Sequence, residues 1–379
     1  MTRKNKKPEI SIILPCRNEE QALPVCLKQI KNVIKQYKLS AEIIVSDSST
    51  DKSPQIAKKE KVILLKHDKE GYGNAYLEAF KIVRGEYIFM ADADCTYDFH
   101  EIPTFIEELK RGSDLIIGNR FAKKIDPQAM PFLKRYIGNP TLSLLFRLFF
   151  NAKIKDTQSG MRAITKKALN NLNLQTTGME FASEMLIKAV RNKLKIKELP
   201  IHYYPRIGYS KLKPLPDGWK HIRFMLLYSP NFLFFIPGLT MFLLGVLSMI
   251  CFYFISFQIL GIKLSYQTMF FSSVLIIIGY QLINFAAFAK IYSINHLNEE
   301  NKKLEKMFKY VTLEKALFVG VLMLLIGTII SFLVLVKWMK NGFESFAELK
   351  NLIIGFTFLL LGMQTVFSSF MLSILSIKK

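Results

Sequence analysis

Four long stretches without charge constrain what this chain can fold into. They lie between Arg223 and the C-terminus, and each encloses at least about 20 uncharged, mostly apolar residues, enough rise as a helix to cross a hydrocarbon core of roughly 30 Å. Since lipid satisfies no backbone polar groups, such runs must be helical. We therefore expect a transmembrane domain over residues 230–379, with four helices over about 231–258, 268–292, 315–337 and 351–375.

The charge of the chain agrees with a membrane setting. A net charge of +22 would suit binding to nucleic acid, anionic lipid or phosphorylated substrates. The apolar spans favour membrane lipid over nucleic acid as the partner. The apolar run Ile10–Leu14 is too short for a signal peptide, so the first half is expected in the cytoplasm. Lysines between the second and third spans and at the end of the chain favour both termini there, which predicts a multi-pass protein of the cell membrane. The spans leave homo-oligomerisation open.

The first half alternates short apolar runs with helical patterns, which is typical of a parallel sheet flanked by helices. We expect an α/β domain over residues 1–229, with strands at Glu9–Leu14, Glu42–Val45, Val62–Leu65, Tyr87–Met90 and Leu115–Ile117. Helices are expected at Glu19–Tyr37, Ser53–Lys59, Gly73–Arg84 and Phe99–Lys110. Polar, turn-forming segments follow the first, second and fourth strands. Ligands bind beyond the carboxyl ends of such strands, so these segments predict one shared crevice.

Two further segments mix apolar and basic residues. Met130–Asn151 and Gly218–Tyr228 both predict amphipathic helices that lie at the lipid interface. For the first of them, a helix of the soluble core is the alternative.

Asp92 and Asp94 follow an apolar strand and are one residue apart. Two carboxylates in this position can share one hard divalent cation, which in turn bridges phosphate oxygens. Turn formation or helix capping is the alternative, and the position after a buried strand favours the cation. Thr96 and Asp98 could add outer ligands or cap the next helix. The four cysteines have no metal-binding spacing and indicate reduced, structural thiols.

Eight motifs along the first half become specific when they are taken together and in order. They are SIILPCRNE, VSDSSTDKS, GYGNAYLEAF, YIFMADADCTYD, GNRF, DTQSGMRAI, GMEFASEMLIKA and YYPRIGYSKL. The set resembles the family 2 glycosyltransferases that charge polyprenyl phosphates with a sugar, the dolichol-phosphate mannose and glucose synthases. The resemblance covers roughly residues 9–229 and implies a GT-A (Rossmann-like) nucleotide-sugar domain, while the four spans match the anchor of some members by hydropathy alone.

The resemblance implies a site for a nucleotide sugar in the first strand-end loops. Pro15, Arg17 and Glu19 would grip the nucleotide, and Asp47 would hydrogen-bond the base or ribose, with an Asx turn as the alternative. Ser46 stands where many relatives carry a second acid, which leaves the base selectivity open.

A second group of residues would act on the donor phosphates. Gly73 and Asn74 would let the backbone approach the donor and begin a helix that favours phosphate, or form a simple turn. Asp92 and Asp94 would hold Mg²⁺ or Mn²⁺; Thr96 stands where mannose synthases can have a glutamine ligand. Arg206 and Lys211 would close over the diphosphate as a mobile loop, or form a juxtamembrane basic segment.

Other residues would serve the acceptor, by the same resemblance. Arg120 and Arg135 would bind the phosphate of a polyprenyl or dolichyl phosphate, although Arg135 could instead anchor to lipid headgroups. Ser159 and Arg162 would lie close to the reacting sugar or its phosphates. Glu180 could hold sugar hydroxyls, while Glu184, on the same helical face, could be solvated.

These parts suit a single displacement. The acceptor is a phosphate monoester that is already ionised, so catalysis needs positioning and charge neutralisation rather than a strong base, and we expect inversion at the anomeric carbon. The sequence leaves UDP-glucose and GDP-mannose open as donors. A processive polysaccharide synthase is one rival, although Trp219 and Trp338 do not lie in the QxxRW segment such enzymes carry. Translocation of a lipid-linked sugar, with the first half as a sensor, is another.

Overall fold

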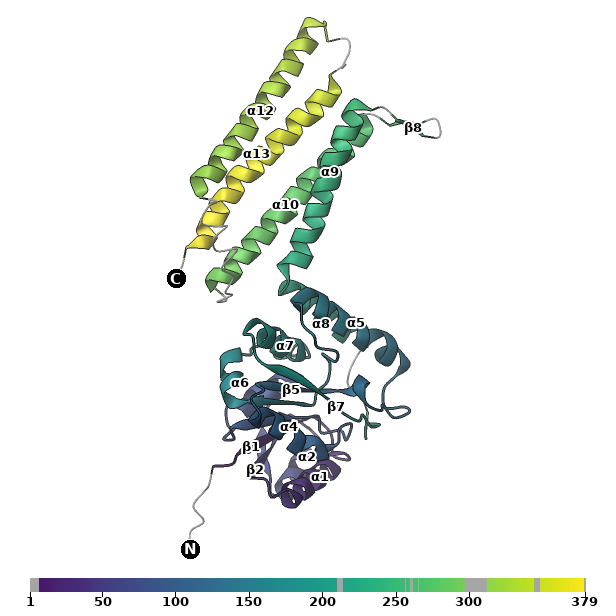
Figure 1. Ribbon diagram of the computed structural model, residues 1–379, viewed down its shortest axis with the longest axis vertical. Helices are drawn as coiled ribbons and strands as arrows, with labels where there is room; N and C mark the ends of the chain where they lie inside the picture. The colour runs from purple at the N-terminus through teal and green to yellow at the C-terminus, as the bar shows by residue number, and fades with distance from the viewer. Residues whose placement is uncertain are drawn as a thin grey trace. The chain divides into compact units, whose positions relative to one another are not determined.

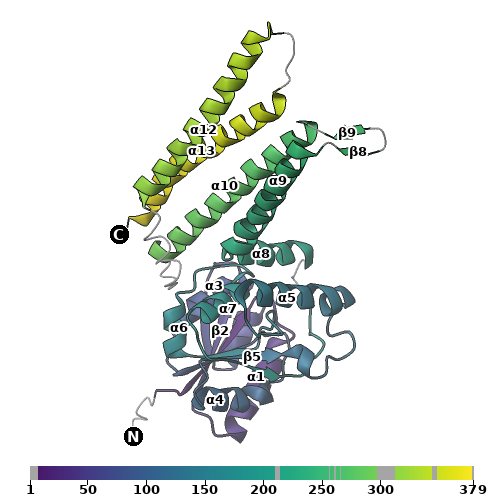
Figure 2. The ribbon, with the colours of Figure 1, turned by 45° about the horizontal axis from the view of Figure 1, so that its top comes forward.

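The computed structural model describes residues 7–209, 214–255, 257–259, 262–264, 266–296, 312–343 and 348–377. The chain divides into two compact units, Met1–Tyr228 and Ser229–Lys379, which we call the sheet unit and the helical unit. Figure 1 and Figure 2 show an α/β fold in the first and long helices in the second. The predicted fold class, an α/β domain followed by four apolar helices, is confirmed.

The sheet unit contains seven strands in the order β3-β2-β1-β4-β6-β5-β7. The strands are β1 (Ile10–Cys16), β2 (Ala41–Asp47), β3 (Ile63–Lys66), β4 (Tyr87–Met90), β5 (Leu115–Asn119), β6 (Arg162–Thr165) and β7 (Ile196–Pro200). The first five agree with the prediction to within a few residues, whereas β6 and β7 were not predicted. Strand β6 runs antiparallel to both β4 and β5, so the sheet is mixed rather than purely parallel.

Helices cover both faces of this sheet (Figure 1). They are α1 (Leu23–Gln36), α2 (Ser53–Lys59), α3 (Tyr72–Phe80), η1 (Phe99–Glu101), α4 (Ile102–Lys110), η2 (Arg120–Ala122), η3 (Leu133–Gly138), α5 (Asn139–Phe150), α6 (Lys166–Leu172), α7 (Phe181–Arg191) and α8 (Pro214–Leu227). Strand side chains alternate between two apolar layers, because successive residues point to opposite faces. In β1, Ile12 packs with α1 and α4 on one face, while Ile13 packs with α3 and α7 on the other.

The segments predicted to be interfacial form η3, α5 and α8. Leu142 and Phe146 of α5 are buried in the core of the sheet unit. Phe132, just before η3, is 73% exposed. The other exposed apolar side chains of η3 and α5 are Leu133, Tyr136, Ile137, Leu144 and Leu148. Helix α5 is therefore apolar on the face that meets the core and also on the face that does not.

The helical unit contains four helical stretches that are each long and apolar enough to cross a membrane: Asn231–Phe254, Tyr266–Ile294, Leu313–Lys340 and Leu349–Ser376. They comprise η4 (Asn231–Phe235) with α9 (Ile236–Phe254), α10 (Tyr266–His296), α12 (Leu313–Lys340) and α13 (Leu349–Ser376). A short hairpin of β8 (Phe257–Ile259) and β9 (Ile262–Leu264) lies between α9 and α10.

Glycines let helices of this unit approach closely. A methyl group added at Gly327 of α12 would lie 2.7 Å from the carbonyl oxygen of Gly355 in α13, and one added at Gly279 of α10 would lie 2.4 Å from the backbone nitrogen of Phe242 in α9. In lipid, where no hydrophobic force drives helices together, such close backbone packing and hydrogen bonds between helices stabilise association. One such bond joins Ser273 of α10 to Thr357 of α13 at 2.7 Å.

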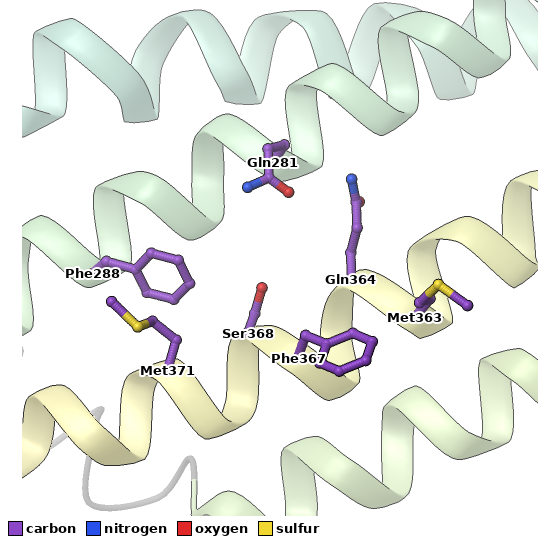
Figure 3. Close-up of a pocket in the computed structure, with 7 residues that line it drawn as sticks. All are labelled: Gln281, Phe288, Met363, Gln364, Phe367, Ser368 and Met371. Carbon is purple, nitrogen blue, oxygen red and sulfur yellow. The ribbon is translucent and has the colours of Figure 1, made fainter.

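A groove of about 300 Å³ lies between α10 and α13. Figure 3 shows Gln281 of α10 and Gln364 of α13 at the groove, with aromatic and methionine side chains around them. The remaining lining residues are Phe288, Met363, Phe367, Ser368 and Met371.

Candidate active site

Three loops meet at one edge of the sheet. Asp92 and Asp94 follow β4, and Arg120 follows β5, at the carboxyl ends of two strands that point the same way. Because β6 runs antiparallel between them, the segment that precedes it, Asp156–Gly160, reaches the same edge. Here a methyl group added at Gly160 would lie 2.6 Å from Asp92 Oδ2.

The two aspartates share a confined position. Asp94 accepts hydrogen bonds from the backbone N–H of Thr96 at 3.1 Å and from its hydroxyl at 2.6 Å. The pKa of Asp92 is raised to about 7, mainly by burial and secondly by the negative charge of Asp94. A hydrogen bond from Tyr72 lowers this pKa in part. Two carboxylates one residue apart at a strand end supply hard oxygen donors, which suit a divalent cation such as Mg²⁺ or Mn²⁺. No group of three or more His, Cys, Asp or Glu side chains that could hold a metal occurs among the described residues.

Asp98 has the capping role that the sequence left open. Its carboxylate accepts the backbone N–H of His100 at 2.9 Å and so caps η1. Thr96, by contrast, is buried and holds Asp94.

Arg206 joins the predicted diphosphate loop to the aspartates. Its guanidinium donates to Glu19 Oε1 at 3.0 Å and lies 3.8 Å from Asp94 Oδ2. Backbone hydrogen bonds fix this segment, because Ile207 N–H donates to the carbonyl of Asp94 at 3.0 Å and Tyr204 N–H donates to that of Thr96 at 3.0 Å. The structure thus brings Glu19, Asp94 and Arg206 together, while Lys211 lies outside the described residues.

Asp47 lies at the end of β2, where the register pairs it with Cys16 and pairs Pro15 with Ser46. Its side chain is 0% exposed, and neither carboxylate oxygen has a hydrogen-bond partner within the described structure. An Asx turn is therefore excluded, since such a turn requires one of these oxygens to accept a backbone N–H. A buried carboxylate without a partner is costly unless a ligand supplies donors. Arg17, in contrast, is half-exposed and pairs with Glu70 at 2.7 Å.

Arg120 is 5% exposed and is already paired. Its Nε and Nη2 donate to the two carboxylate oxygens of Asp156 at 2.8 Å each, and its guanidinium lies 5.2 Å from the ring centre of Tyr203. Asp156 thus balances the positive charge that was predicted for the acceptor phosphate. Arg135 is half-buried on η3, with its guanidinium 5.4 Å from the ring centre of Tyr136.

Sequence reasoning missed Lys134, which is half-buried on η3. Burial lowers the pKa of Lys134; the charges of Arg206 and Arg120 act in the same direction, and Asp217 opposes them. Lys134 is therefore within electrostatic range of the arginines at the sheet edge. Its only sequence signal was a basic residue in an otherwise apolar helix, a pattern that headgroup anchoring also explains.

Arg162, which was predicted to lie close to the reacting sugar or its phosphates, is held by backbone carbonyls. Arg162 is 2% exposed, and its guanidinium donates to the backbone carbonyls of Ser159 (3.0 Å), Ala182 (2.8 Å) and Thr157 (3.0 Å). These three bonds use one N–H of each guanidinium nitrogen, and two of them tie Arg162 to the acceptor-side loop at Thr157 and Ser159. Ser159 itself is fully buried, with a hydroxyl that has no partner within the described structure.

The backbone N–H groups of Gly73 and Asn74, at the predicted phosphate-binding helix start, already have partners. Their backbone N–H groups donate to the carbonyls of Gly178 (3.2 Å) and Thr177 (3.0 Å), so the chain itself occupies the start of α3. A methyl group at Gly73 would lie 2.1 Å from the carbonyl oxygen of Thr176. Gly71 and Gly73 therefore admit a neighbouring loop of this protein at close range.

The two glutamates near this loop differ from one another. Glu184 is not solvated: it is 1% exposed and accepts the backbone N–H of Thr176 at 2.8 Å, which anchors the loop that covers α3. Glu180 Oε2 is buried and has no hydrogen-bond partner within the described structure. It is therefore able to accept a hydrogen bond from a ligand hydroxyl.

Comparison with known proteins adds the family. The chain matches the description "Glycosyl transferase family 2" over residues 11–172 and "Glycosyltransferase family 2 C-terminal transmembrane region" over residues 287–376. It is 36% identical over 366 residues to a Haloferax volcanii protein named low-salt glycan biosynthesis hexosyltransferase Agl6, covering 96% of this chain and 88% of the relative.

Two of the other relatives match over about half of this chain. A dolichyl-phosphate hexose transferase of Haloferax volcanii is 30% identical over 211 residues, or 55% of this chain and 89% of the relative. A dolichol-phosphate mannosyltransferase of Pyrococcus furiosus is 30% identical over 213 residues, or 54% of this chain and 59% of the relative. The chain therefore belongs to the family 2 glycosyltransferases, as a membrane protein similar to the dolichol-phosphate hexose synthases.

Proposed function

We propose that this glycosyltransferase moves a hexose from a nucleotide sugar to a polyprenyl or dolichyl phosphate, giving a lipid-linked sugar. The observation that carries the proposal is the carboxylate pair Asp92 and Asp94 beside Arg206, at the sheet edge that also receives the loop before β6. The names of the relatives support the same acceptor class.

The donor would lie across the ends of β1, β2 and β4. The buried, unpartnered carboxylate of Asp47 would accept N–H groups of the base, and both uracil and guanine offer such donors. Asp92 and Asp94 would hold Mg²⁺ or Mn²⁺, which when bound supplies positive charge to the donor diphosphate. Arg206 would neutralise the leaving diphosphate from the other side, while Glu19 orients its guanidinium.

The acceptor phosphate would meet the cations of η3. Lys134 and Arg135 lie on this stretch, and Lys134 is within electrostatic range of Arg120 and Arg206. Exposed apolar side chains on η3 and α5 support a lipid-facing surface for the polyprenyl chain. Arg120 would act mainly by fixing the loop of Asp156, to which it is already paired.

The phosphate monoester needs no base, so positioning accounts for the reaction. Its oxygen would attack the anomeric carbon, the bond to the diphosphate would break, and the configuration would invert. NMR of the anomeric centre in the intact lipid-linked product checks this, and retention would contradict a single displacement. The lysine distribution supports cytoplasmic termini, which protease protection in sealed vesicles would test.

The decisive experiment uses membranes that contain the full chain. Radiolabelled UDP-glucose and GDP-mannose are supplied separately with polyprenyl phosphate, with and without Mg²⁺ or Mn²⁺. We expect label to enter the organic phase from one donor, in a metal-dependent manner, and to disappear in the Asp92→Ala/Asp94→Ala variant. Asp98→Asn is the matched control, because this carboxylate on the same loop caps η1. Unchanged transfer in the double variant, or transfer from neither donor, would overturn the proposal.

A further inference from the structure

Two thiols meet beside the aspartate pair. Cys26 lies on α1, and Cys95 directly follows Asp94. The two cysteines are 69 positions apart in the chain, but their Sγ atoms are only 3.3 Å apart. Cys95 Sγ also donates to the carbonyl of Ala22 at 3.5 Å, which holds it against the start of α1. The sequence indicated only reduced structural thiols, because the two cysteines have no characteristic spacing.

The two thiols differ in access. Cys26 is 0% exposed, in the apolar core beneath α1, whereas Cys95 is partly exposed. A reagent from solution can therefore reach Cys95 first, and Cys26 lies where it can attack the product. An exposed thiol beside a resolving thiol is the usual arrangement of redox-sensitive cysteines.

We propose that Cys26 and Cys95 form a reversible disulfide when the protein meets a low-molecular-weight disulfide such as oxidised glutathione. In the first step the Cys95 thiolate attacks the glutathione disulfide, forms a mixed disulfide and releases one glutathione thiol. The Cys26 thiolate then attacks the Cys95 sulfur and releases the second glutathione. The protein loses two electrons and two protons, and two glutathione thiols are formed.

The neighbouring residues indicate what this bond would do. A disulfide is about 2.05 Å long, so the two sulfurs must approach by about 1.2 Å. Cys95 has φ +64, the left-handed region that few residues other than glycine adopt, so its backbone has little freedom to absorb the change. The displacement would fall on Asp94 and Thr96 on either side, whose carbonyls accept hydrogen bonds from the segment of Arg206.

The functional consequence rests on the proposed function. Displacing Asp94 would disturb the metal-binding pair and its contact with Arg206, and a misplacement of about 1 Å can reduce a rate by about 100-fold. The disulfide would thus switch off transfer in an oxidising environment, and thioredoxin or dithiothreitol would restore it.

The other two cysteines provide controls. Cys16 is buried against Ser49, with Sγ and Oγ 3.7 Å apart, and burial raises the pKa of Cys16 to about 12, which keeps it as an unreactive thiol. Cys251 lies on α9, in the helical unit. Cys251→Ala therefore removes a thiol without touching the pair.

The test uses the purified full chain in detergent, equilibrated in buffers of increasing oxidised-to-reduced glutathione ratio. After alkylation, mass spectrometry of peptides detects a Cys26–Cys95 crosslink, and transfer is assayed on the same samples. We expect crosslink and loss of transfer to rise together in the wild type and in Cys251→Ala, to reverse with dithiothreitol, and both to be absent in Cys95→Ala, which offers glutathione no thiol beside Asp94. Thermal melting checks that Cys95→Ala stays folded.

Three results would overturn the proposal. Glutathione could remain on Cys95 without transfer to Cys26, the crosslink could form with no loss of transfer, or Cys95→Ala could lose activity on oxidation as the wild type does. Failure of the proposed function is distinguishable from these, because a reduced protein that transfers no sugar still yields a peptide map.

Discussion

Replacing Gly160 with alanine tests whether the loop before β6 must fit closely against Asp92. A methyl group at this position would lie 2.6 Å from Asp92 Oδ2 and 3.1 Å from the hydroxyl of Tyr72, whereas ordinary contact begins at 3.4 Å. The carboxylate or the loop must therefore move by about 0.8 Å, the difference between 3.4 and 2.6 Å. Because a misplacement of about 1 Å can cost about 100-fold, we expect kcat to fall by roughly 10- to 100-fold.

The assay is the metal-dependent transfer of labelled hexose to polyprenyl phosphate. We expect the concentration of Mn²⁺ that gives half-maximal rate to rise in Gly160→Ala, because the displaced carboxylate is one of the two proposed ligands. The matched control is Gly218→Ala on α8, where a methyl group would meet nothing within 4 Å. A Gly160→Ala protein with wild-type kcat and metal dependence would refute the argument that this close packing positions Asp92.

Three further predictions concern stability. His221 is 4% exposed, and burial lowers its pKa from 6.5 to about 4. Between these pH values the unfolded state binds a proton that the folded state does not, so stability should fall by about 3 kcal/mol as the pH drops from 6.5 towards 4. The accompanying decrease in melting temperature should be smaller in His221→Asn and should persist in the exposed control His100→Asn. Arg162→Met should lower stability by about 3 kcal/mol, because buried carbonyls lose their donors, without a selective change in acceptor KM; a folded variant with KM raised more than about tenfold would instead restore the phosphate-binding role. Gly327→Val should lower the melting temperature in detergent, since its side chain would strike the backbone of Gly355, and an unchanged melting temperature would show that α12 and α13 do not depend on this contact.

The strands that the sequence predicted all contain apolar runs; those of β1, β2, β4 and β5 are mostly buried, whereas β3 lies at the edge of the sheet and is exposed or half-buried. Strand β6 begins with Arg162, and β7 (IKELP) lies at the edge of the sheet with charged side chains at two of its five positions, so neither has the apolar signal of β1. The antiparallel direction of β6 was equally hidden, because direction follows from how the chain returns to the sheet rather than from local composition.

The candidate site was predictable where a residue type and a strand end suffice, as for Asp92, Asp94 and Asp47. It was not predictable where one pattern serves two purposes. A glycine pair before a helix suits a phosphate or a neighbouring backbone equally, and only the approach of Thr176 to Gly73 distinguishes them. In the same way, the partners of Arg162 are carbonyls, which every residue carries and no motif reveals.

Arg206 gives the carboxylate pair a resident counter-ion. A divalent ion that arrives at Asp94 competes with the guanidinium 3.8 Å away, and repulsion between the two cations opposes its binding. A diphosphate relieves that repulsion, because it offers anionic oxygens to the metal and to the arginine at once. Metal and sugar nucleotide should then bind with positive cooperativity, each strengthening the other by the same factor. Either one titrated alone would bind weakly, so an affinity measured for the cation by itself understates how the loaded enzyme holds it.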